Sequence, residues 1–599
     1  MPQKREYWRK LDNAANMYSA TSNKKITRVF RFYCELKENV EQEPLQQALD
    51  LTLKKYPIFL SVIRKGLFWH YLEKSSLRPV VHEENKKPCS KMYIQDKKSL
   101  LFEVTFYKNR INFEVFHALT DGTGAIEFLR ELVKNYLMIV HSLEDVLLSD
   151  PMITIQDQES NAFNHYYTKQ KKETEKRQKA FQIKKSYKKT DGLFIHEATV
   201  PVKKLIQIAK SYHVSLTEYL CAVLMMAIQK EMSQEDKIKH PVRLMVPVNL
   251  RNFFASKSML NFFSYITPDF LFDHETSFEE LIQNIHLYFQ DALQTERISE
   301  HMSRMIHLEK HPLLRLIPLE VKNLGIKAGS RYAEGDVTAI LSNMGIVKMP
   351  ESYAPYIERF GIFTNTPKLE LTVCSFEEQI TLSFTSTFDT LNIQRNFFQI
   401  LKMHEAEFEI LDCDFPEPEE DRVHLWIKMY SFICLSLISF CVATHFTFDV
   451  STGWTVFMSA GIISAWAVIF VGYKKRYNIL KNAMWQLVLL SIISVLWDAF
   501  TGWYGWSVNY FIPVLCVFIL LFMFVVSNVR KDTAREYMIY LVMNCAFGMI
   551  IPLLCLGLGW IQYRLLSVFC ILISFLCLVA IIMFKGREFK EEMNKKFHW

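Results

Sequence analysis

Residues 117–122 read His-Ala-Leu-Thr-Asp-Gly, and this short stretch decides the interpretation of the chain. An apolar run over 111–116 precedes it, and a helical pattern over 125–137 follows it. A strand that ends in histidine and turns through an aspartate and a glycine into a helix presents one imidazole at a cleft. Histidine suits a general base near neutral pH. We therefore take His117 as a candidate base, with Asp121 fixing the local backbone or the ring and Gly122 permitting a backbone conformation that other residues resist.

Length and charge divide the chain into two parts. The chain has 599 residues and a formal net charge of +7, which is long enough for several domains. Residues 422–599 hold 15 Lys and Arg against 7 Asp and Glu, a net of +8, so residues 1–421 carry −1. The first part is thus expected to be a nearly neutral globular polypeptide. Its lack of a basic surplus argues against nucleic-acid binding.

Cysteine usage and the N-terminal residues indicate a reduced, cytoplasmic environment. The 12 cysteines include no CxxC pair and have no regular spacing, and seven of them lie in the apolar second part. This pattern predicts neither a disulfide framework nor a metal site. The first ten residues are polar and charged, which predicts no secretory signal peptide and a cytoplasmic N-terminal part.

Six apolar segments in the second part are each near the length that crosses a bilayer as a helix. They lie near residues 429–447, 453–472, 483–500, 508–528, 537–559 and 566–584. Clusters of Lys and Arg occupy the linkers after the second and fourth segments and the C-terminal tail. The positive-inside rule therefore predicts that these linkers, the tail and the first part are cytoplasmic. The basic residues are Lys474, Lys475, Arg476, Lys481, Arg530, Lys531, Arg535, Lys585, Arg587, Lys590, Lys595 and Lys596.

One acidic residue, Asp498, falls at the outer end of the third segment. An intramembrane acid suggests a functional contact, such as one to a substrate head group. Its position near the segment end instead favours an interfacial loop residue wetted at the surface. No chain of acidic or basic residues runs through the segments, so a proton-coupled transporter is not favoured.

The first part contains two successive α+β patterns. The first has strands near 28–36, 59–64, 67–72, 101–107 and 111–116 and a helix over 43–55. The second has strands near 193–200, 243–248, 338–342, 360–364, 369–376 and 379–386 and helices over 202–212, 216–231, 277–293 and 391–409. Ser215 and Glu218 form a capping-box signal. A basic stretch over 169–189 separates the two patterns; a plain linker is favoured over a contact with the cytoplasmic leaflet.

With these patterns in place, the first part resembles the superfamily of chloramphenicol acetyltransferase, condensation domains and alcohol O-acetyltransferases. Three segments carry the resemblance in the expected order: 117–122, 246–251 (Val-Pro-Val-Asn-Leu-Arg) and 341–345 (Leu-Ser-Asn-Met-Gly). The opening Trp-Arg-Lys-Leu-Asp at 8–12 is similar to the alcohol acetyltransferase branch. The resemblance covers about residues 5–410. The sequence has no GxGxxG, P-loop or GxSxG motif that would support a competing fold.

The resemblance implies an α+β fold, a two-lobed chloramphenicol-acetyltransferase-like pseudo-dimer with a tunnel between its lobes, followed by an all-α transmembrane bundle. The expected domains are an N-terminal lobe (1–160), a basic linker (161–191), a C-terminal lobe (192–411), a second linker (412–423) and a six-helix transmembrane domain (424–599). No metal and no permanently bound cofactor are expected.

The resemblance also assigns roles to individual residues. His117 would deprotonate the acceptor. Asp121 would be mainly structural and paired with an arginine, for which Arg251 is the candidate, with Asn249 as a supporting residue of the same segment. Ser342 or Asn343 could donate to the developing oxyanion. Ordinary strand-end hydrogen bonding is the alternative for the last two.

The leading hypothesis is a membrane-anchored acyltransferase that moves an acetyl or longer acyl group from acyl-CoA to a hydroxyl or amine. The acceptor would be an amphipathic, lipid-like or alcohol molecule at the bilayer. One alternative is a condensation-type amide or ester synthase that uses an acyl carrier protein. Phe116 takes the place of the first histidine of the doubled pair common in the superfamily, which does not indicate inactivity. No clear DFGWG segment is present, and this leaves the donor open. Another alternative, a silent binding module that regulates a membrane protein, is disfavoured by the intact His117 and Asp121.

Overall fold

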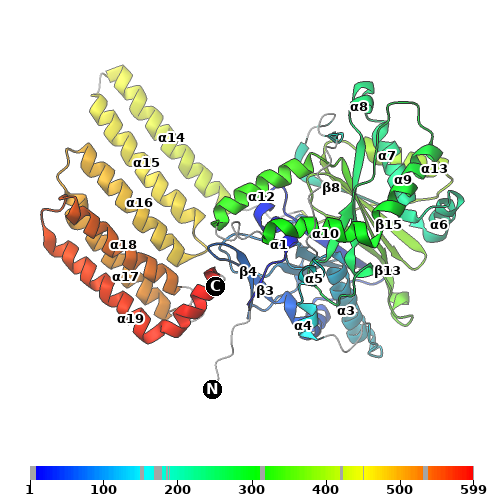
Figure 1. Cartoon of the computed structure of the whole chain (residues 1–599), viewed down its shortest axis with the longest axis horizontal. Coiled ribbons are helices and arrows are strands. Elements are labelled where there is room, and N and C mark those ends of the chain that lie inside the picture. Colours follow the sequence, from blue (N-terminus) through cyan, green and yellow to red (C-terminus); the bar gives the residue numbers. More distant parts are fainter. Residues whose placement is uncertain are drawn as a thin grey trace. The chain divides into compact units, whose positions relative to one another are not determined.

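The computed structural model describes residues 8–148, 154–167, 178–183, 187, 189–310, 317–417, 422–448, 451–529 and 537–597. The chain forms two compact units, which we call the two-sheet unit and the helical unit (Figure 1). The two-sheet unit comprises Met1–Arg64, His70–Ile94 and Ser99–Pro418, and the helical unit comprises Lys65–Trp69, Gln95–Lys98 and Glu419–Trp599. Residues 168–177, 184–186 and 188 of the basic linker, residues 418–421 of the second linker, and Arg530, Lys531 and Arg535 lie outside the described residues.

The first sheet of the two-sheet unit carries the histidine motif. Its strand order is β13-β2-β7-β6-β5, and a separate three-stranded sheet has the order β1-β4-β3. The strands are β1 (Trp8–Lys10), β2 (Val29–Leu36), β3 (Ser61–Lys65), β4 (His70–Lys74), β5 (His82–Glu83), β6 (Phe102–Tyr107), β7 (Arg110–Phe116) and β13 (Ile357–Thr364). Helices α1 (Asn13–Thr21), α2 (Gln42–Lys55) and α3 (Gly122–His141) belong to the same lobe. The alternating apolar residues of β2 and β7 fill its core, where Phe32 and Phe113 are fully buried.

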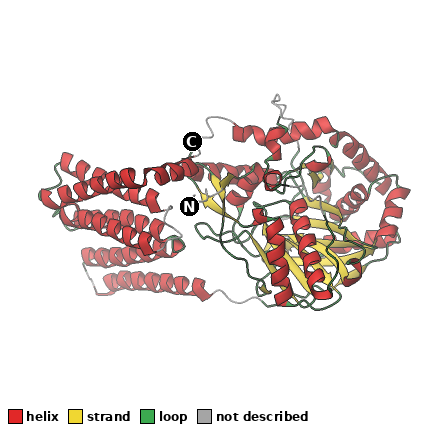
Figure 2. Cartoon of the chain, turned by 90° about the horizontal axis from the view of Figure 1, so that it is seen from below, coloured by secondary structure: helices red, strands yellow, loops and turns green. Residues whose placement is uncertain are grey.

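The second sheet has the order β10-β9-β12-β14-β15-β8-β16, with β11 paired to β9. Its strands are β8 (Lys189–Pro201), β9 (Val242–Asn249), β10 (Phe263–Ile266), β11 (Asp269–Phe270), β12 (Ala339–Ile346), β14 (Leu369–Phe376), β15 (Gln379–Phe388) and β16 (Glu409–Leu411). Its helices include α6 (Val202–Ser211), α7 (Leu216–Gln229), α9 (Phe278–Ala292), α10 (Thr295–Lys310), α12 (Leu319–Glu334) and α13 (Asn392–Met403). Figure 2 shows these strands flanked by helices, so the predicted α+β class is confirmed.

One strand departs from the sequence-based pattern. The strand near 360–364, expected in the second lobe, pairs antiparallel with β2 in the first sheet, where Phe360 lies opposite Cys34. Gly361 makes the close approach possible, because a Cβ there would lie 2.3 Å from the ring of Tyr33. The apolar alternation of this strand is compatible with either sheet, and only the tertiary fold selects the partner. This strand and β2 join the two lobes.

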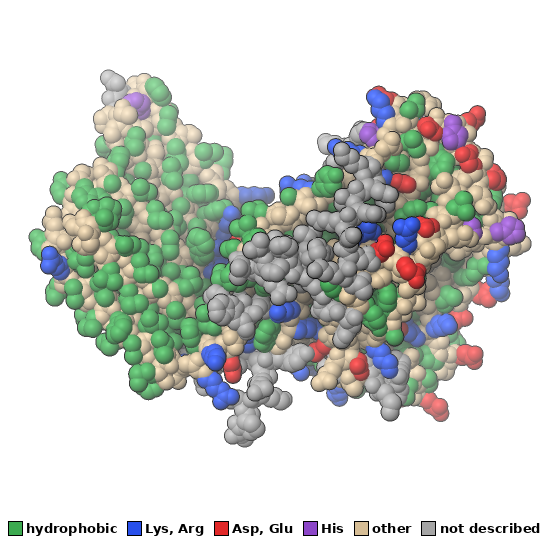
Figure 3. Space-filling view, viewed as in Figure 1, with side chains coloured by type: hydrophobic (Ala, Val, Ile, Leu, Met, Phe, Trp, Pro, Cys, Tyr) green, Lys and Arg blue, Asp and Glu red, His purple; other side chains and the backbone are tan. Residues whose placement is uncertain are grey.

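Within its described residues, the helical unit contains six helices long and apolar enough to cross a membrane, as predicted. They are α14 (Arg422–Phe448), α15 (Thr452–Lys474), α16 (Ile479–Phe500), α17 (Ile512–Val529, entered through the π-helical turn Ser507–Phe511), α18 (Tyr537–Gly557) and α19 (Arg564–Phe597). Hydrophobic side chains cover the face of this unit seen in Figure 3. The bent pair α6–α7 also passes the same length and composition test, but α7 owes its apolar character to burial in the core of the second lobe.

Asp498 is neither wetted at the surface nor free to bind a head group. Its side chain is fully buried in the helical unit. Its carboxylate accepts hydrogen bonds from the backbone N–H groups of Gly505, at 3.0 Å, and Ser507, at 2.9 Å, and from Ser507 Oγ at 2.7 Å. Buried carboxylates need such donors, and the loop between α16 and α17 supplies them. Asp498 is therefore a structural residue that closes this loop.

Candidate active site

His117 lies directly beyond the end of β7, as the sequence pattern predicts. Its backbone N–H donates to the carbonyl oxygen of Arg28 at 3.0 Å, which continues the pairing of β2 with β7 by one residue. Four residues later, Asp121 caps α3 by accepting from Gly124 N at 3.1 Å. A strand end and a helix cap therefore fix the two ends of the motif.

Aromatic rings surround the imidazole of His117. The Tyr18 ring, from α1, stacks on it with centroids 4.2 Å apart. Phe30 packs edge-to-face at 4.8 Å, and Phe263 lies at 5.7 Å. Burial among these rings lowers the pKa of His117 to about 4, because the charged imidazolium loses hydration there. The ring is therefore neutral near pH 7 and able to accept a proton.

Asn261 fixes which nitrogen of His117 carries the proton. Its amide nitrogen donates to the carbonyl oxygen of His117 at 3.1 Å and to Asp12 Oδ2 at 3.1 Å. Both hydrogens of the amide are thus used on acceptors, and the amide oxygen must face the ring. Asn261 Oδ1 lies 3.2 Å from His117 Nδ1. Nδ1 is therefore the protonated nitrogen, and Nε2 keeps its lone pair, with no hydrogen-bond partner among the described residues.

Asp12, near the start of the chain, holds the side chain of Asn261. It is buried, and it caps α1 by accepting from Ala15 N at 2.7 Å. Burial raises the pKa of the Asp12 carboxyl to about 6, although hydrogen bonds from Ala15 and Asn261 oppose this shift. At neutral pH the carboxylate is ionised and acts only as an acceptor. That property holds the Asn261 amide in one orientation.

Asp121 and Arg251, which the resemblance proposes as partners, form a buried ion pair. Arg251 Nη1 lies 2.7 Å from Asp121 Oδ2, and the same oxygen accepts from Phe262 N at 2.9 Å. Asp121 thus joins the start of α3 to Arg251 and to Phe262, the residue before strand β10 of the second sheet. Neither of its oxygens is directed at His117, so its role in the structure is support.

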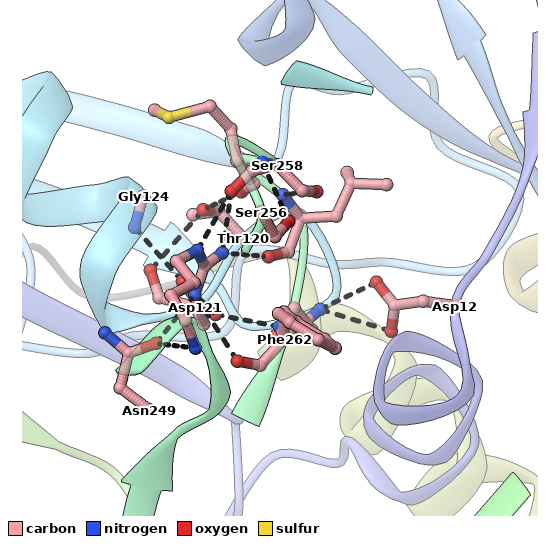
Figure 4. Close-up of polar contacts among 12 residues, drawn as sticks. Asp12, Thr120, Asp121, Gly124, Asn249, Ser256, Ser258 and Phe262 are labelled. Atoms are coloured by element: carbon pink, nitrogen blue, oxygen red, sulfur yellow. Dashed lines mark hydrogen bonds and ion pairs between the residues drawn. The ribbon is translucent and has the colours of Figure 1, made fainter. Parts of the chain in front are cut away.

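Arg251 fastens the loop that carries Asn261. Its guanidinium donates to the carbonyl oxygens of Ser258 and Leu260, each at 2.7 Å, and Asn249 Oδ1 accepts from Arg251 N at 3.0 Å. All five residues of loop 258–262 are buried. Figure 4 shows Asp12 and Asp121 reaching this loop from opposite sides of the view. The ion pair of Asp121 with Arg251 therefore fixes the position of Asn261.

Gly122 and Gly124, at the start of α3, are explained by the lack of room for a Cβ atom at either position. Gly122 does not have the special backbone conformation expected from the sequence, because its φ is not positive. A Cβ at Gly122 would lie 2.6 Å from Cε of Met344, a flexible side chain. A Cβ at Gly124 would lie 2.7 Å from the backbone oxygen of Met259 and closer still to Thr120. The start of α3 thus packs tightly against loop 258–262.

Ser342 and Asn343 differ in their freedom to donate. The Asn343 amide donates to Thr217 Oγ1 at 3.0 Å, and its oxygen accepts from Gly345 N at 2.9 Å. Ser342 has no side-chain hydrogen bond among the described residues and is half-buried. Met344, two residues after Ser342 on β12, lies against Gly122. The register of β12 with β14 shifts between Asn343 and Ile346, so alternation along the strand does not assign Ser342 to the face of Met344.

Most residues predicted from the sequence come together here, and two important ones were not predicted. His117, Asp121, Gly122, Asn249 and Arg251 form one hydrogen-bonded or packed group around loop 258–262. Asp12 was noticed only as part of a similar opening segment, and Asn261 carried no local signal. Among the described residues, no group of three His, Cys, Asp or Glu could hold a metal ion.

Two family models match parts of the chain. Residues 146–411 match the model of the alcohol acetyltransferase family. The expected acyltransferase class is thereby confirmed, and the matched residues include Arg251, Ser342 and Asn343, whereas His117 precedes them. Residues 415–599 match a family of unknown function (DUF6320). A search of curated proteins finds no match to the chain.

Several solved structures are similar to the two-sheet unit at low identity. The first condensation domain of the CDA synthetase is 11% identical with a TM-score of 0.47, and the match covers 68% of this chain and 99% of that one. The trichothecene 15-O-acetyltransferase from Fusarium sporotrichioides is 11% identical with a TM-score of 0.46, over 67% and 94%. The F. sporotrichioides TRI101 protein, crystallised with coenzyme A and T-2, is 9% identical with a TM-score of 0.47, over 67% and 99%.

Proposed function

We propose that this protein is a membrane-anchored acyltransferase in which His117 is the general base. The proposed reaction moves an acetyl or longer acyl group from acyl-CoA to a hydroxyl or amine of an amphipathic, lipid-like or alcohol acceptor. The observation that carries the proposal is the orientation of His117 by Asn261, which leaves Nε2 as an unprotonated base. The match of residues 146–411 to alcohol acetyltransferases supports the reaction class.

The chemistry follows from the neutral ring. Nε2 takes the proton of the acceptor hydroxyl while the hydroxyl oxygen attacks the thioester carbonyl carbon. The C–S bond then breaks, and the proton passes from Nε2 to the departing sulfur, which leaves as a free thiol. Nδ1–H stays bonded to Asn261 Oδ1, so the imidazolium that forms keeps its orientation. Such a base contributes about 100- to 10,000-fold to the rate.

Ser342 is the proposed donor to the oxyanion of the tetrahedral intermediate. Its hydroxyl makes no hydrogen bond among the described residues, while the amide of Asn343 is occupied by Thr217. A donor that waits unpaired costs no reorganisation at the moment of reaction. Asn343 is assigned instead to holding the strand end against α7.

The six apolar helices are proposed to anchor the enzyme with its two-sheet unit on the cytoplasmic side. The basic residues Lys474, Lys475 and Arg476 at the end of α15 support this orientation. An enzyme held at the bilayer meets acceptors that partition into it. This supports a lipid-like or amphipathic acceptor over a freely soluble one.

The test is release of free thiol by the purified full-length chain in detergent. Acetyl-CoA and longer acyl-CoAs are offered with and without a lipid extract, and His117→Ala is run beside wild type. His274→Ala is the control, because His274 is an exposed histidine outside the candidate active site. We expect release that requires both the extract and His117. Equal release by His117→Ala would overturn the base, and release from an acyl carrier protein alone would overturn the CoA donor.

A further inference from the structure

Helix α12 (Leu319–Glu334) is an unusually exposed part of the two-sheet unit. It has 16 residues, of which Leu319 is the one classed as buried. Ser330 and Glu334 are half-buried on its inner side, which packs against α1 (Figure 1). On the other side, Val321 is 56% exposed, Leu324 67% and Tyr332 82%. Helices of this length depend on packing of an apolar face for stability, yet the apolar face of α12 is turned outward.

The outward residues form a continuous stripe. Val321, Leu324, Ala328 and Tyr332 follow the spacing i, i+3, i+7 and i+11, which places them on one side of a helix. We call these four residues the α12 stripe. The neighbouring Gly325 and Gly329 would each place a Cβ in open space, with nothing within 4 Å. Among the described residues, nothing covers the stripe.

Basic residues flank the stripe. At about 100° per residue, Lys322 lies on one side of it and Lys327 and Arg331 lie on the other. Lys327 is also near Lys91, whose pKa is lowered by burial and then by the charges of Lys24 and Lys327. Of the two acidic residues on α12, Glu334 is turned inward and pairs with Arg28 at 3.0 Å. The other, Glu320, lies on the same side as Lys327 and Arg331. The three basic residues outnumber this one acid, so the borders of the apolar stripe carry a net positive charge.

We infer that the α12 stripe binds the surface of an anionic lipid bilayer. An apolar helix face bordered by Lys and Arg lies in the interface of a membrane, with its apolar side chains among the acyl chains and its cations at the phosphates. The inference rests on the membrane anchoring of the proposed function, since the six apolar helices keep a bilayer within reach. It does not rest on acyl transfer.

The stripe is connected to the candidate base by few contacts. Glu334 of α12 pairs with Arg28, and the carbonyl oxygen of Arg28 accepts from the backbone N–H of His117 at 3.0 Å. The Arg28 guanidinium also lies over the ring of Tyr18, 6.0 Å from its centroid, and that ring stacks on His117. A bilayer on the stripe would therefore lie beside the elements that hold the base. This placement suits an acceptor taken from the lipid phase.

Photocrosslinking of the full-length chain tests the inference without any turnover. A photoreactive residue is introduced as Leu324→p-benzoylphenylalanine, and Leu287→p-benzoylphenylalanine is the matched control. Leu287 is a leucine of α9 with a similar exposure of 64%. The chain is reconstituted in vesicles of phosphatidylcholine, alone or mixed with phosphatidylserine. Lipid adducts are quantified by mass spectrometry after irradiation.

We expect more lipid adduct at Leu324 than at Leu287, a higher yield with phosphatidylserine, and a loss of about fivefold on Lys327→Glu. A yield at Leu324 no greater than at Leu287 would overturn the inference. Crosslinking of Leu324 to a second copy of the chain instead would also overturn it. An equal adduct yield with and without phosphatidylserine would refute the preference for anionic lipid. Because no outcome depends on acyl transfer, failure here is distinguishable from failure of the proposed reaction.

Discussion

The amide nitrogen of Asn261 lies 3.1 Å from Oδ2 of Asp12, although 249 residues separate the two in the chain. This contact joins the N-terminal segment of the first lobe to a loop of the second lobe. The same amide group faces the carbonyl of His117 with its second hydrogen. The protonation pattern of the candidate base is thus set by residues from three distant parts of the sequence.

Asp12→Asn is expected to lower activity while the fold is kept. The new amide can still cap α1, but it can also donate, so Asn261 is no longer held in one orientation. Residues that orient a functional histidine in this way typically contribute about 10- to 100-fold. We expect a loss of this size in kcat/KM, with no loss of thermal stability at pH 7. Unchanged activity would show that the Asn261 orientation does not depend on Asp12.

The same substitution should change how stability depends on pH. The folded pKa of Asp12, about 6, is above its ordinary value of 3.8. The carboxyl therefore contributes stability below pH 3.8 that is lost as pH rises through 6, up to about 3 kcal/mol. Relative to wild type, Asp12→Asn should gain free energy of unfolding between pH 4 and pH 7. Denaturant unfolding at several pH values measures this, and a parallel dependence for both proteins would contradict it.

Asp121→Asn should destabilise the two-sheet unit. Arg251 is mostly buried, and removing its partner leaves a buried charge poorly compensated, at a cost of about 3 kcal/mol. The control is Glu378→Gln, which breaks the exposed pair of Lys203 with Glu378 and should leave stability unchanged. Thermal melts of both variants provide the comparison. Equal melting temperatures of the two variants would mean that the backbone carbonyl groups around Arg251 compensate its charge without Asp121.

Ser342→Ala and Asn343→Ala should have different consequences. Loss of an oxyanion donor lowers kcat by about 100- to 1,000-fold with little change in KM or in the melting temperature. Loss of the Asn343 amide frees Thr217 and the Gly345 backbone, so it should lower the melting temperature. Steady-state kinetics with thermal melts separates the two. If Asn343→Ala alone showed the kinetic loss at unchanged stability, the donor assignment would move to Asn343.

The pH–rate profile should have its acid limb well below that of a free histidine. His117 with a pKa of about 4 stays neutral down to that pH, so the main fall in kcat/KM should come as pH drops toward 4. A shallower loss near pH 6, from protonation of Asp12, should be absent in Asp12→Asn. Full recovery after return to pH 7 excludes irreversible unfolding, and circular dichroism at each pH checks that the chain stays folded. A single limb near pH 6.5 in both proteins would contradict the buried, neutral imidazole.

Local patterns in the sequence predict the elements that carry the motif. The apolar alternation before His117 gives β7, and the apolar spacing after it gives α3, because each element buries one face against its own lobe. The capping box of Ser215 and Glu218 marks the start of α7, where the structure has it. These features depend on neighbours within a few residues.

Long-range partners could not be predicted in the same way. Nothing near Asn261 indicates that its amide bridges His117 and Asp12, since the contact exists only after both lobes have folded. The strand partner of β13 is equally hidden, because its alternation fits either sheet. Helix α12 is not among the expected elements, although its apolar residues follow helical spacing, because Gly325 and Gly329 weaken the helical signal of this segment.

A double-mutant cycle on His117 and Asn261 tests the central claim most directly. Initial rates of acyl transfer are measured for wild type, His117→Ala, Asn261→Ala and the double variant, with melts to verify folding. If Asn261 acts by orienting the base, the double variant should be as slow as His117→Ala and no slower. A loss of rate in the double variant equal to the product of the two single losses would contradict the account. A wild-type rate for His117→Ala would contradict it as well.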